Sequence, residues 1–144
     1  MKKFLPLLLF LGLLGCSVSD DGPNSPVRTV YTPISAVSGL PDSFDPDQIY
    51  EITLTYVRPS SCYTNPRIET DANGNNLYLT MVSLYDPSNM NCEEIEDTAG
   101  EFSFEFRVER NDFYIFNFWQ GYNAFNQPVY LKMEIPVTGS GSTN

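Results

Sequence analysis

From residue 27 onward, apolar and polar residues alternate with a period of two, the pattern typical of half-buried β-strands. Residues 101–109 are the clearest case, because three phenylalanines and a valine take every second position between charged and polar residues. Residues 129–137 repeat the pattern, and Pro136 predicts that this strand lies at a sheet edge, since proline has no backbone N–H to donate. Further strands are predicted at 50–56 and 77–85, at 113–119, near 67–70 and near 27–34.

Short polar segments separate these strands. Asn111-Asp112 predicts a tight hairpin between the strands at 102–110 and 113–119. The run Asp-Ala-Asn-Gly-Asn over residues 71–75 predicts a turn that leads into the strand starting at Leu77. No ten-residue stretch keeps a helical period.

About seven short strands, with turn residues every eight to twelve positions, predict a single all-β domain. The expected architecture is an antiparallel sandwich of two sheets, immunoglobulin-like by analogy. A small closed β-barrel like that of the lipocalins is the alternative.

The first fifteen residues have the features of an export signal: two lysines, then an apolar run over residues 4–14. The run is shorter than the roughly 20 apolar residues of a membrane-spanning helix, so we expect it to be removed. The segment Leu13-Leu14-Gly15-Cys16 resembles the lipobox of bacterial lipoproteins. The resemblance implies that Cys16 carries a diacylglyceryl group on sulfur, becomes the mature N-terminus, and is held in a membrane by acyl chains such as palmitate. An ordinary signal peptide with a cysteine near its cleavage point is the alternative.

Residues 16–27 are polar and contain Gly and Pro, which predicts a flexible tether before a domain over residues 28–137. A flexible tail is predicted over residues 138–144. Ser19-Asp20-Asp21 resembles the short acidic export signals of surface lipoproteins in one Gram-negative phylum. This resemblance implies an outer-membrane protein anchored at the cell surface, with attachment facing the periplasm as the alternative.

The chain is acidic, with a formal net charge of −10. Removing Lys2 and Lys3 with the signal leaves six of the eight basic residues against eighteen acidic ones. Nucleic acid and anionic membrane surfaces would repel such a chain, whereas a cationic partner or a divalent cation is compatible with it. Alternatively, the acidic excess only keeps an exported domain soluble.

Three cysteines are present, and lipidation of Cys16 leaves Cys62 and Cys92 as a pair. In an oxidising compartment these two are expected to form a disulfide between two loops, stabilising the fold by roughly 3–4 kcal/mol. Two free thiols or a metal site are the alternatives, but no further Cys or His completes a tetrahedral shell.

The absence of histidine excludes Ser-His-Asp and Cys-His catalysis and His-ligated metals. Paired carboxylates could still hydrolyse glycosides, and Asp45 with Asp47 or the acidic residues at 93–97 are candidates. Both sets lie in loop-like segments, where acidic residues are ordinarily solvated. We therefore predict no catalytic residues and a protein that is not an enzyme.

Calcium is the one cofactor that the acidic loops suggest, because it takes oxygen ligands. Residues 71–75 begin like an EF-hand loop, but Asn76 and Val82 stand where glycine and a bidentate glutamate are required, so a turn explains this segment. Four carboxylates beside Cys92 form the candidate calcium site: Glu93, Glu94, Glu96 and Asp97. Solvation of these carboxylates without a bound cation is the alternative.

Residues 119–127 interleave aromatic and amide side chains between two predicted strands. Trp119, Tyr122 and Phe125 are the candidate ligand-binding residues, because sugar rings and peptides stack on exposed aromatic faces. Alternatively, Trp119 and Phe125 turn inward and cap the core. The sequence thus predicts a non-enzymatic binding module for a glycan or an envelope protein; a structural or accessory envelope protein without a small ligand is the second hypothesis.

Overall fold

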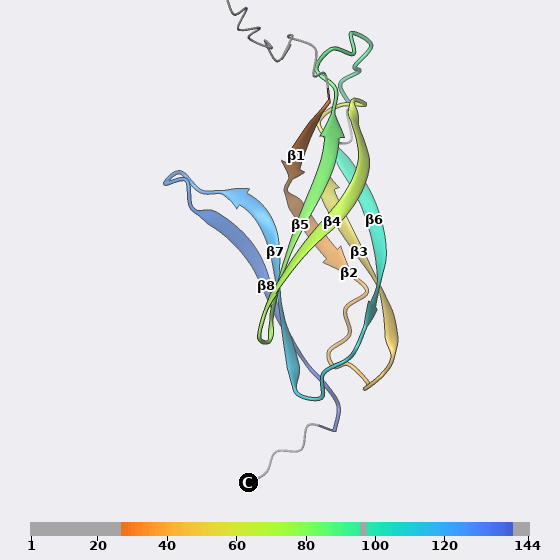
Figure 1. Cartoon of the computed structure of the whole chain (residues 1–144), viewed down its shortest axis with the longest axis vertical. Coiled ribbons are helices and arrows are strands. Elements are labelled where there is room, and N and C mark those ends of the chain that lie inside the picture. Colours follow the sequence, from red (N-terminus) through yellow and green to blue (C-terminus); the bar gives the residue numbers. More distant parts are fainter. Residues whose placement is uncertain (1–26, 96–97, 140–144) are drawn as a thin grey trace, which may run out of the picture.

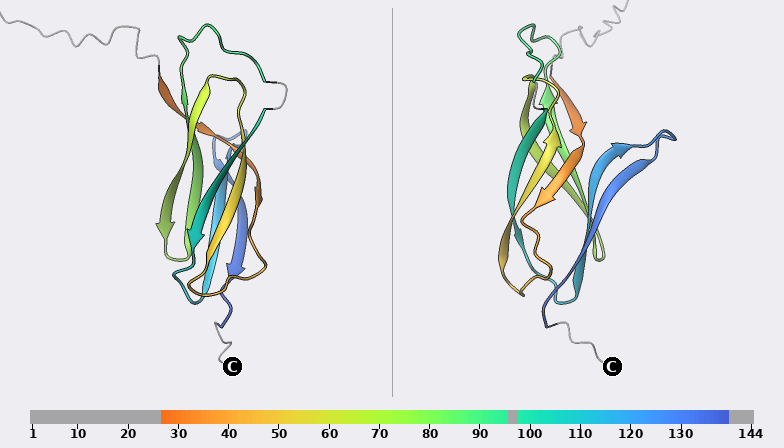
Figure 2. Two further views of the ribbon diagram at one scale, coloured as in Figure 1. Left: turned by 90° about the vertical axis from the view of Figure 1, so that its right-hand side faces the viewer. Right: turned by 180° about the vertical axis from the view of Figure 1, so that it is seen from behind.

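A computed structural model describes residues 27–95 and 98–139 of the chain. The export signal, Cys16, the tether, the tail beyond Gly139, and Glu96 with Asp97 lie outside the described residues. The described part contains no helix and folds as two facing sheets that do not close into a barrel (Figures 1 and 2), so the predicted all-β sandwich is confirmed. Its strands are β1 (Arg28–Thr32), β2 (Ile34–Ser38), β3 (Ile49–Val57), β4 (Tyr63–Asn73), β5 (Asn76–Tyr85), β6 (Ala99–Arg107), β7 (Phe113–Tyr122) and β8 (Pro128–Pro136).

The smaller sheet has the strand order β2-β3-β6, and both of its pairs are antiparallel. In the larger sheet, β4 pairs with β5 along almost the whole length of β5. The other edge of β5 is shared, because residues 76–79 pair with β7 and residues 81–85 pair with β1. β8 lies at the end of this sheet beside β7, as Pro136 predicted.

One segment predicted as a single strand is divided between the sheets. The sequence predicts a strand near residues 27–34, but β1 joins the larger sheet and β2 the smaller one, with Pro33 between them. Pro33 has no N–H to continue a ladder, and its carbonyl instead accepts a hydrogen bond from the N–H of Val57 in β3, at 2.9 Å. This division raises the count to eight strands and connects the two layers through the chain itself.

The core fills the space between the sheets with alternate side chains of β3, β5, β6 and β7. Phe44, from the loop between β2 and β3, is completely buried and closes one end of the core. Its ring centroid lies 4.8 Å from that of Tyr50 and 5.4 Å from that of Phe106. Its N–H donates to the carbonyl of Pro136 at 2.8 Å, so the loop is fixed to the end of β8.

The predicted hairpin between β6 and β7 is wrong. β6 pairs with β3 in the smaller sheet, whereas β7 pairs with β5 and β8 in the larger one. Both strands carry phenylalanines on one face, and these faces meet across the sandwich, as the 5.2 Å separation of the Phe106 and Phe116 rings shows. The connection at Asn111-Asp112 therefore crosses between layers. Because β7 starts from this crossing, it runs parallel to β5, in contrast to the fully antiparallel sandwich that the sequence predicted.

The crossing is held by a network of polar side chains. The guanidinium of Arg110 donates two hydrogen bonds to the carboxylate of Asp112, both at 2.8 Å. The amide of Asn75, from the turn between β4 and β5, donates to the same carboxylate at 2.9 Å. The Arg110 bonds, followed by the bond from Asn75, hold the pKa of Asp112 well below its usual range. This network connects the β4–β5 turn to the β6–β7 crossing.

Cys62 and Cys92 form a disulfide, with Cα atoms 5.4 Å apart and a sequence separation of 30. Cys62 lies between β3 and β4, and Cys92 lies between β5 and β6. The predicted pairing between two loops is therefore confirmed. The bond joins the loops at the end of the sandwich opposite the β6–β7 crossing (Figure 1).

Candidate functional site

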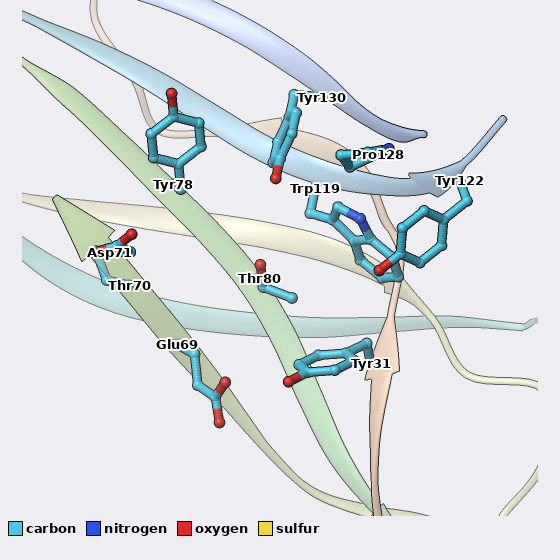
Figure 3. Close-up of a pocket in the computed structure, with 10 residues that line it drawn as sticks. All are labelled: Tyr31, Glu69, Thr70, Asp71, Tyr78, Thr80, Trp119, Tyr122, Pro128 and Tyr130. Atoms are coloured by element: carbon cyan, nitrogen blue, oxygen red, sulfur yellow. The ribbon is translucent and has the colours of Figure 1, made fainter. Parts of the chain in front are cut away.

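A groove of about 630 Å³ lies on the outer face of the larger sheet, away from the core. Five aromatic side chains line it: Tyr31 of β1, Tyr78 of β5, Trp119 and Tyr122 of β7, and Tyr130 of β8. The pairing register explains why they share a face, because residues directly opposite each other on neighbouring strands point to the same side. Trp119 is paired with Tyr130 in this way (Figure 3).

The groove forms where the sheet divides. β7 accompanies β5 only as far as the pair Leu79–Phe118, and from Met81 onward β1 takes its place. Beyond that point the β7–β8 hairpin diverges from β1, as Figure 1 shows. Thr80 lies at the division and exposes only a small side chain between Tyr31 and Trp119 (Figure 3). The groove therefore forms because β7 separates from β1 at Thr80, whose small side chain does not fill the space between them.

A β-bulge places Tyr122 beside Trp119. Three residue steps separate them, so in a regular strand their side chains would point to opposite faces. Gln120 and Gly121 together oppose Val129, and this extra residue returns Tyr122 to the Trp119 face. Gly121 has φ of 108°, a backbone conformation that glycine adopts without the steric cost that other residues incur.

The aromatic rings meet at steep angles. Trp119 is 8% exposed, and the rings of Tyr31 and Tyr122 approach it with centroid distances of 6.1 and 5.4 Å and interplanar angles of 68° and 75°. Tyr31 is 58% exposed and Tyr122 is 61% exposed. A second pair, Tyr78 and Tyr130, has a centroid distance of 5.5 Å and an angle of 73°. The nearly buried indole of Trp119 therefore forms the base of the groove, and Tyr31 and Tyr122 on either side of it are available to a ligand.

The polar side of the groove is acidic. Glu69 and Asp71 on β4 line it, and their cross-strand partners on β5 are Thr80 and Tyr78. The carboxylate of Glu69 forms an exposed ion pair with Arg67 at 3.2 Å. No Lys or Arg is among the described residues that line the groove. Aromatic faces, hydroxyls and carboxylates are the groups available to a ligand here.

A second hollow, of about 610 Å³, lies near the disulfide end and is lined by Tyr56, Arg58 and Glu101 among others. Tyr56 packs directly against Gly100, where an added Cβ would come within 2.5 Å of the Tyr56 ring. Burial raises the pKa of Tyr56, and the nearby charge of Arg58 opposes this rise. The buried Nε of Arg58 has no hydrogen-bond partner in the described structure.

Two of the three predicted ligand-binding residues, Trp119 and Tyr122, line the groove together. Phe125 does not line it: its side chain is 84% exposed in the β7–β8 turn. Neither Trp119 nor Phe125 belongs to the core cluster, so neither caps the core. Sequence reasoning missed Tyr31, Tyr78 and Tyr130, although Tyr130 stands at an outward position of the alternating strand over residues 129–137, where a polar residue is the usual choice.

The acidic candidates do not come together. Asp45 and Asp47 are exposed in the loop between β2 and β3, whereas Glu93 and Glu94 are exposed at the disulfide end of the molecule. The described residues contain no group of three or more His, Cys, Asp or Glu side chains that could hold a metal ion. Because Glu96 and Asp97 lie outside the described residues, the calcium site at 93–97 stays a prediction.

No protein-family model, curated protein or solved structure matches this chain. Within the described ranges, no helix is long and apolar enough to cross a membrane. The fold and the groove are therefore the basis for assigning a function.

Proposed function

We propose that this chain is an envelope lipoprotein, anchored in the outer membrane through Cys16, whose β-sandwich is a non-enzymatic binding module for a glycan or a protein. The segment Leu13-Leu14-Gly15-Cys16 supports the anchor, and the acidic residues that follow favour the cell surface. The groove on the larger sheet is the proposed binding surface.

The observation that carries this proposal is the exposure of Tyr31 and Tyr122 on either side of Trp119. Two large aromatic side chains with more than half of their surface in water gain free energy when a ligand covers them. They lie over a hollow that also offers Thr80 and two carboxylates as hydrogen-bonding groups. Concave surfaces with aromatic walls and a few polar groups are typical of ligand sites.

The test uses the chain from residue 16 with Cys16→Ser, applied to a glycan array and to a pull-down from envelope extract. We expect a retained glycan or protein whose affinity falls by roughly tenfold or more in Tyr122→Ala, since central aromatic contacts often contribute 1–3 kcal/mol. Phe125→Ala is the matched control, because Phe125 is exposed but does not line the groove. Failure to retain any ligand, or equal retention by both variants, would contradict the proposal.

A further inference from the structure

The charge of the groove restricts its ligand. Glu69 and Asp71 line the groove, and no basic side chain is among its described lining residues. The whole chain has a net charge of −10, so the potential around the groove repels anions. Anionic glycans and phosphate groups are therefore disfavoured relative to neutral or cationic ligands.

The aromatic rings and carboxylates of the groove together favour a cation. Tyr31 and Tyr122 stand at 68° and 75° to the indole of Trp119, and Tyr78 stands at 73° to Tyr130. These are edge-to-face ring contacts that leave Trp119 almost completely covered, so Tyr31 and Tyr122 on either side of it supply the aromatic surface that a ligand can reach. Ammonium and guanidinium groups are attracted to aromatic faces within about 6 Å, and a nearby carboxylate adds to this attraction.

The aromatic rings of the groove form two groups, Tyr78 with Tyr130 and Trp119 with Tyr31 and Tyr122, and a carboxylate of β4 lies beside each group. Asp71 is paired with Tyr78, beside Tyr130, and Asp71 forms no ion pair in the described structure. Glu69 is paired with Thr80, which follows the last β5 residue that pairs with β7 and so lies beside Trp119. The ion pair between Glu69 and Arg67 is exposed, and exposed pairs contribute little to stability because water screens them, so Glu69 can accept another cation.

The spacing of the two carboxylates points to a peptide. Glu69 and Asp71 are two residues apart on one strand, so they repeat at about 6.6–6.8 Å. Alternate side chains of any extended peptide share this repeat. We infer that the groove takes an extended basic segment of a partner protein, with Lys or Arg at alternate positions opposite Glu69 and Asp71. This inference rests on the proposed binding function of the groove.

The experiment compares two peptides of equal composition and charge, Lys-Ser-Lys-Ser-Lys-Ser-Ser and Lys-Ser-Ser-Lys-Ser-Ser-Lys. Only the first places neighbouring lysines on one face of an extended chain. Trp119 is the single tryptophan, so its fluorescence reports binding at the groove in the chain from residue 16 with Cys16→Ser. We expect the alternating peptide to bind about tenfold more tightly, and its affinity to fall as the salt concentration rises.

Two variants of the groove, each with a matched control, test the site. Asp71→Asn is expected to weaken binding of the alternating peptide by about fivefold to tenfold, whereas Glu105→Gln, which removes one exposed carboxylate from the other sheet, leaves it unchanged. Tyr122→Ala is expected to weaken binding further, and Phe125→Ala to have no effect.

Three outcomes would overturn this inference. Equal affinity for the two peptides, or equal effects of Asp71→Asn and Glu105→Gln, would mean general attraction to an acidic protein. Binding of a neutral oligosaccharide that depends on Tyr122 but not on salt, without peptide binding, would also overturn it, while the proposed binding function would stand. If neither peptides nor glycans nor envelope proteins bind through Tyr122, the proposed function itself fails.

Discussion

Asp112 is the most strongly constrained carboxylate of the described residues. Arg110 and Asn75 together donate three hydrogen bonds to it, and its pKa is well below the usual value. A carboxylate with a depressed folded-state pKa stabilises the fold above its unfolded pKa, about 3.9, and this contribution is lost as the pH falls toward the folded pKa.

Replacing Asp112 with Asn is therefore expected to lower the melting temperature at pH 7, because the ionised acceptor of the network is removed. The difference between the original chain and Asp112→Asn should stay constant down to about pH 5 and shrink steadily below about pH 4. Thermal unfolding followed by circular dichroism from pH 7 to pH 3 measures it. A difference that does not depend on pH would show that the carboxylate charge contributes nothing to the network.

Two phenylalanines in loops provide a matched pair for core packing. Phe44 is fully buried among the rings of Tyr50 and Phe106, whereas Phe125 is 84% exposed. We expect Phe44→Ala to reduce the free energy of unfolding by about 3–5 kcal/mol and Phe125→Ala to change it by less than about 0.5 kcal/mol. Denaturant unfolding of both variants gives the comparison, and similar losses in the two would contradict the core described here.

At the scale of strands, the bulge in β7 can be tested by removal and rescue. Gly121→Ala places a side chain at φ of 108°, which is expected to cost about 1–3 kcal/mol and to disturb the position of Tyr122. The added Cβ itself has room, because its nearest neighbour, Cγ of Pro33, is 3.7 Å away. The cause of the loss would therefore be the backbone conformation.

Deleting Gln120 in the Gly121→Ala background should restore stability and the contact between Tyr122 and Trp119. Without the extra residue, a regular strand already places both side chains on one face, so no bulge is needed. Unfolding measurements and nuclear Overhauser contacts between the two rings test this. A deletion that further separates the rings would contradict the register described above.

The disulfide stabilises the connection between two loops. Replacing Cys62 and Cys92 with serine is expected to reduce the free energy of unfolding by roughly 3–4 kcal/mol, because a bond across 30 residues restricts the unfolded chain. Reductant should produce a similar loss in the original chain and none in the double variant. A chain whose stability does not respond to reductant would contradict the bond.

The alternation of residues 101–109 and 129–137 was sufficient to predict β6, β8 and most of their inward-facing positions, although Val129, at the bulged end of β8, is exposed. Alternation specifies a face, however, and not the neighbouring strand. Asn111-Asp112 therefore looked like a hairpin although β6 and β7 belong to different sheets. For the same reason Trp119 and Tyr122 could be predicted from one segment, whereas Tyr31 and Tyr78 join them only through the pairing of β5 with the distant strands β1 and β7.

At the scale of the whole molecule, the proposed anchor at Cys16 would determine where the groove can operate. We expect mass spectrometry of the mature protein to find acyl groups on Cys16, and Cys16→Ser to release the chain from the membrane fraction. A diacylated residue holds a protein stably because each buried methylene contributes about 0.8 kcal/mol. An unmodified Cys16 in a membrane-bound chain would contradict the lipoprotein assignment.

Protease treatment of intact cells separates the two possible faces of the outer membrane. Degradation of the anchored domain without lysis is expected for a surface protein. Protection until the membrane is permeabilised would place the domain in the periplasm, and the basic partner would then be a periplasmic protein.

The parallel junction between β5 and β7 also has a consequence for the order of assembly. The β4–β5 and β7–β8 hairpins can close early because their partners are close in sequence, but β5 and β7 meet through four residue pairs only after the intervening chain has crossed to the other sheet and returned. Closing such a long loop is entropically costly and slow. The pairs between β1 and β5, which bring Tyr31 to the groove, lie even further apart in the sequence. The proposed binding surface should therefore form after the two hairpins, so that a chain still in the process of folding could not yet capture a partner.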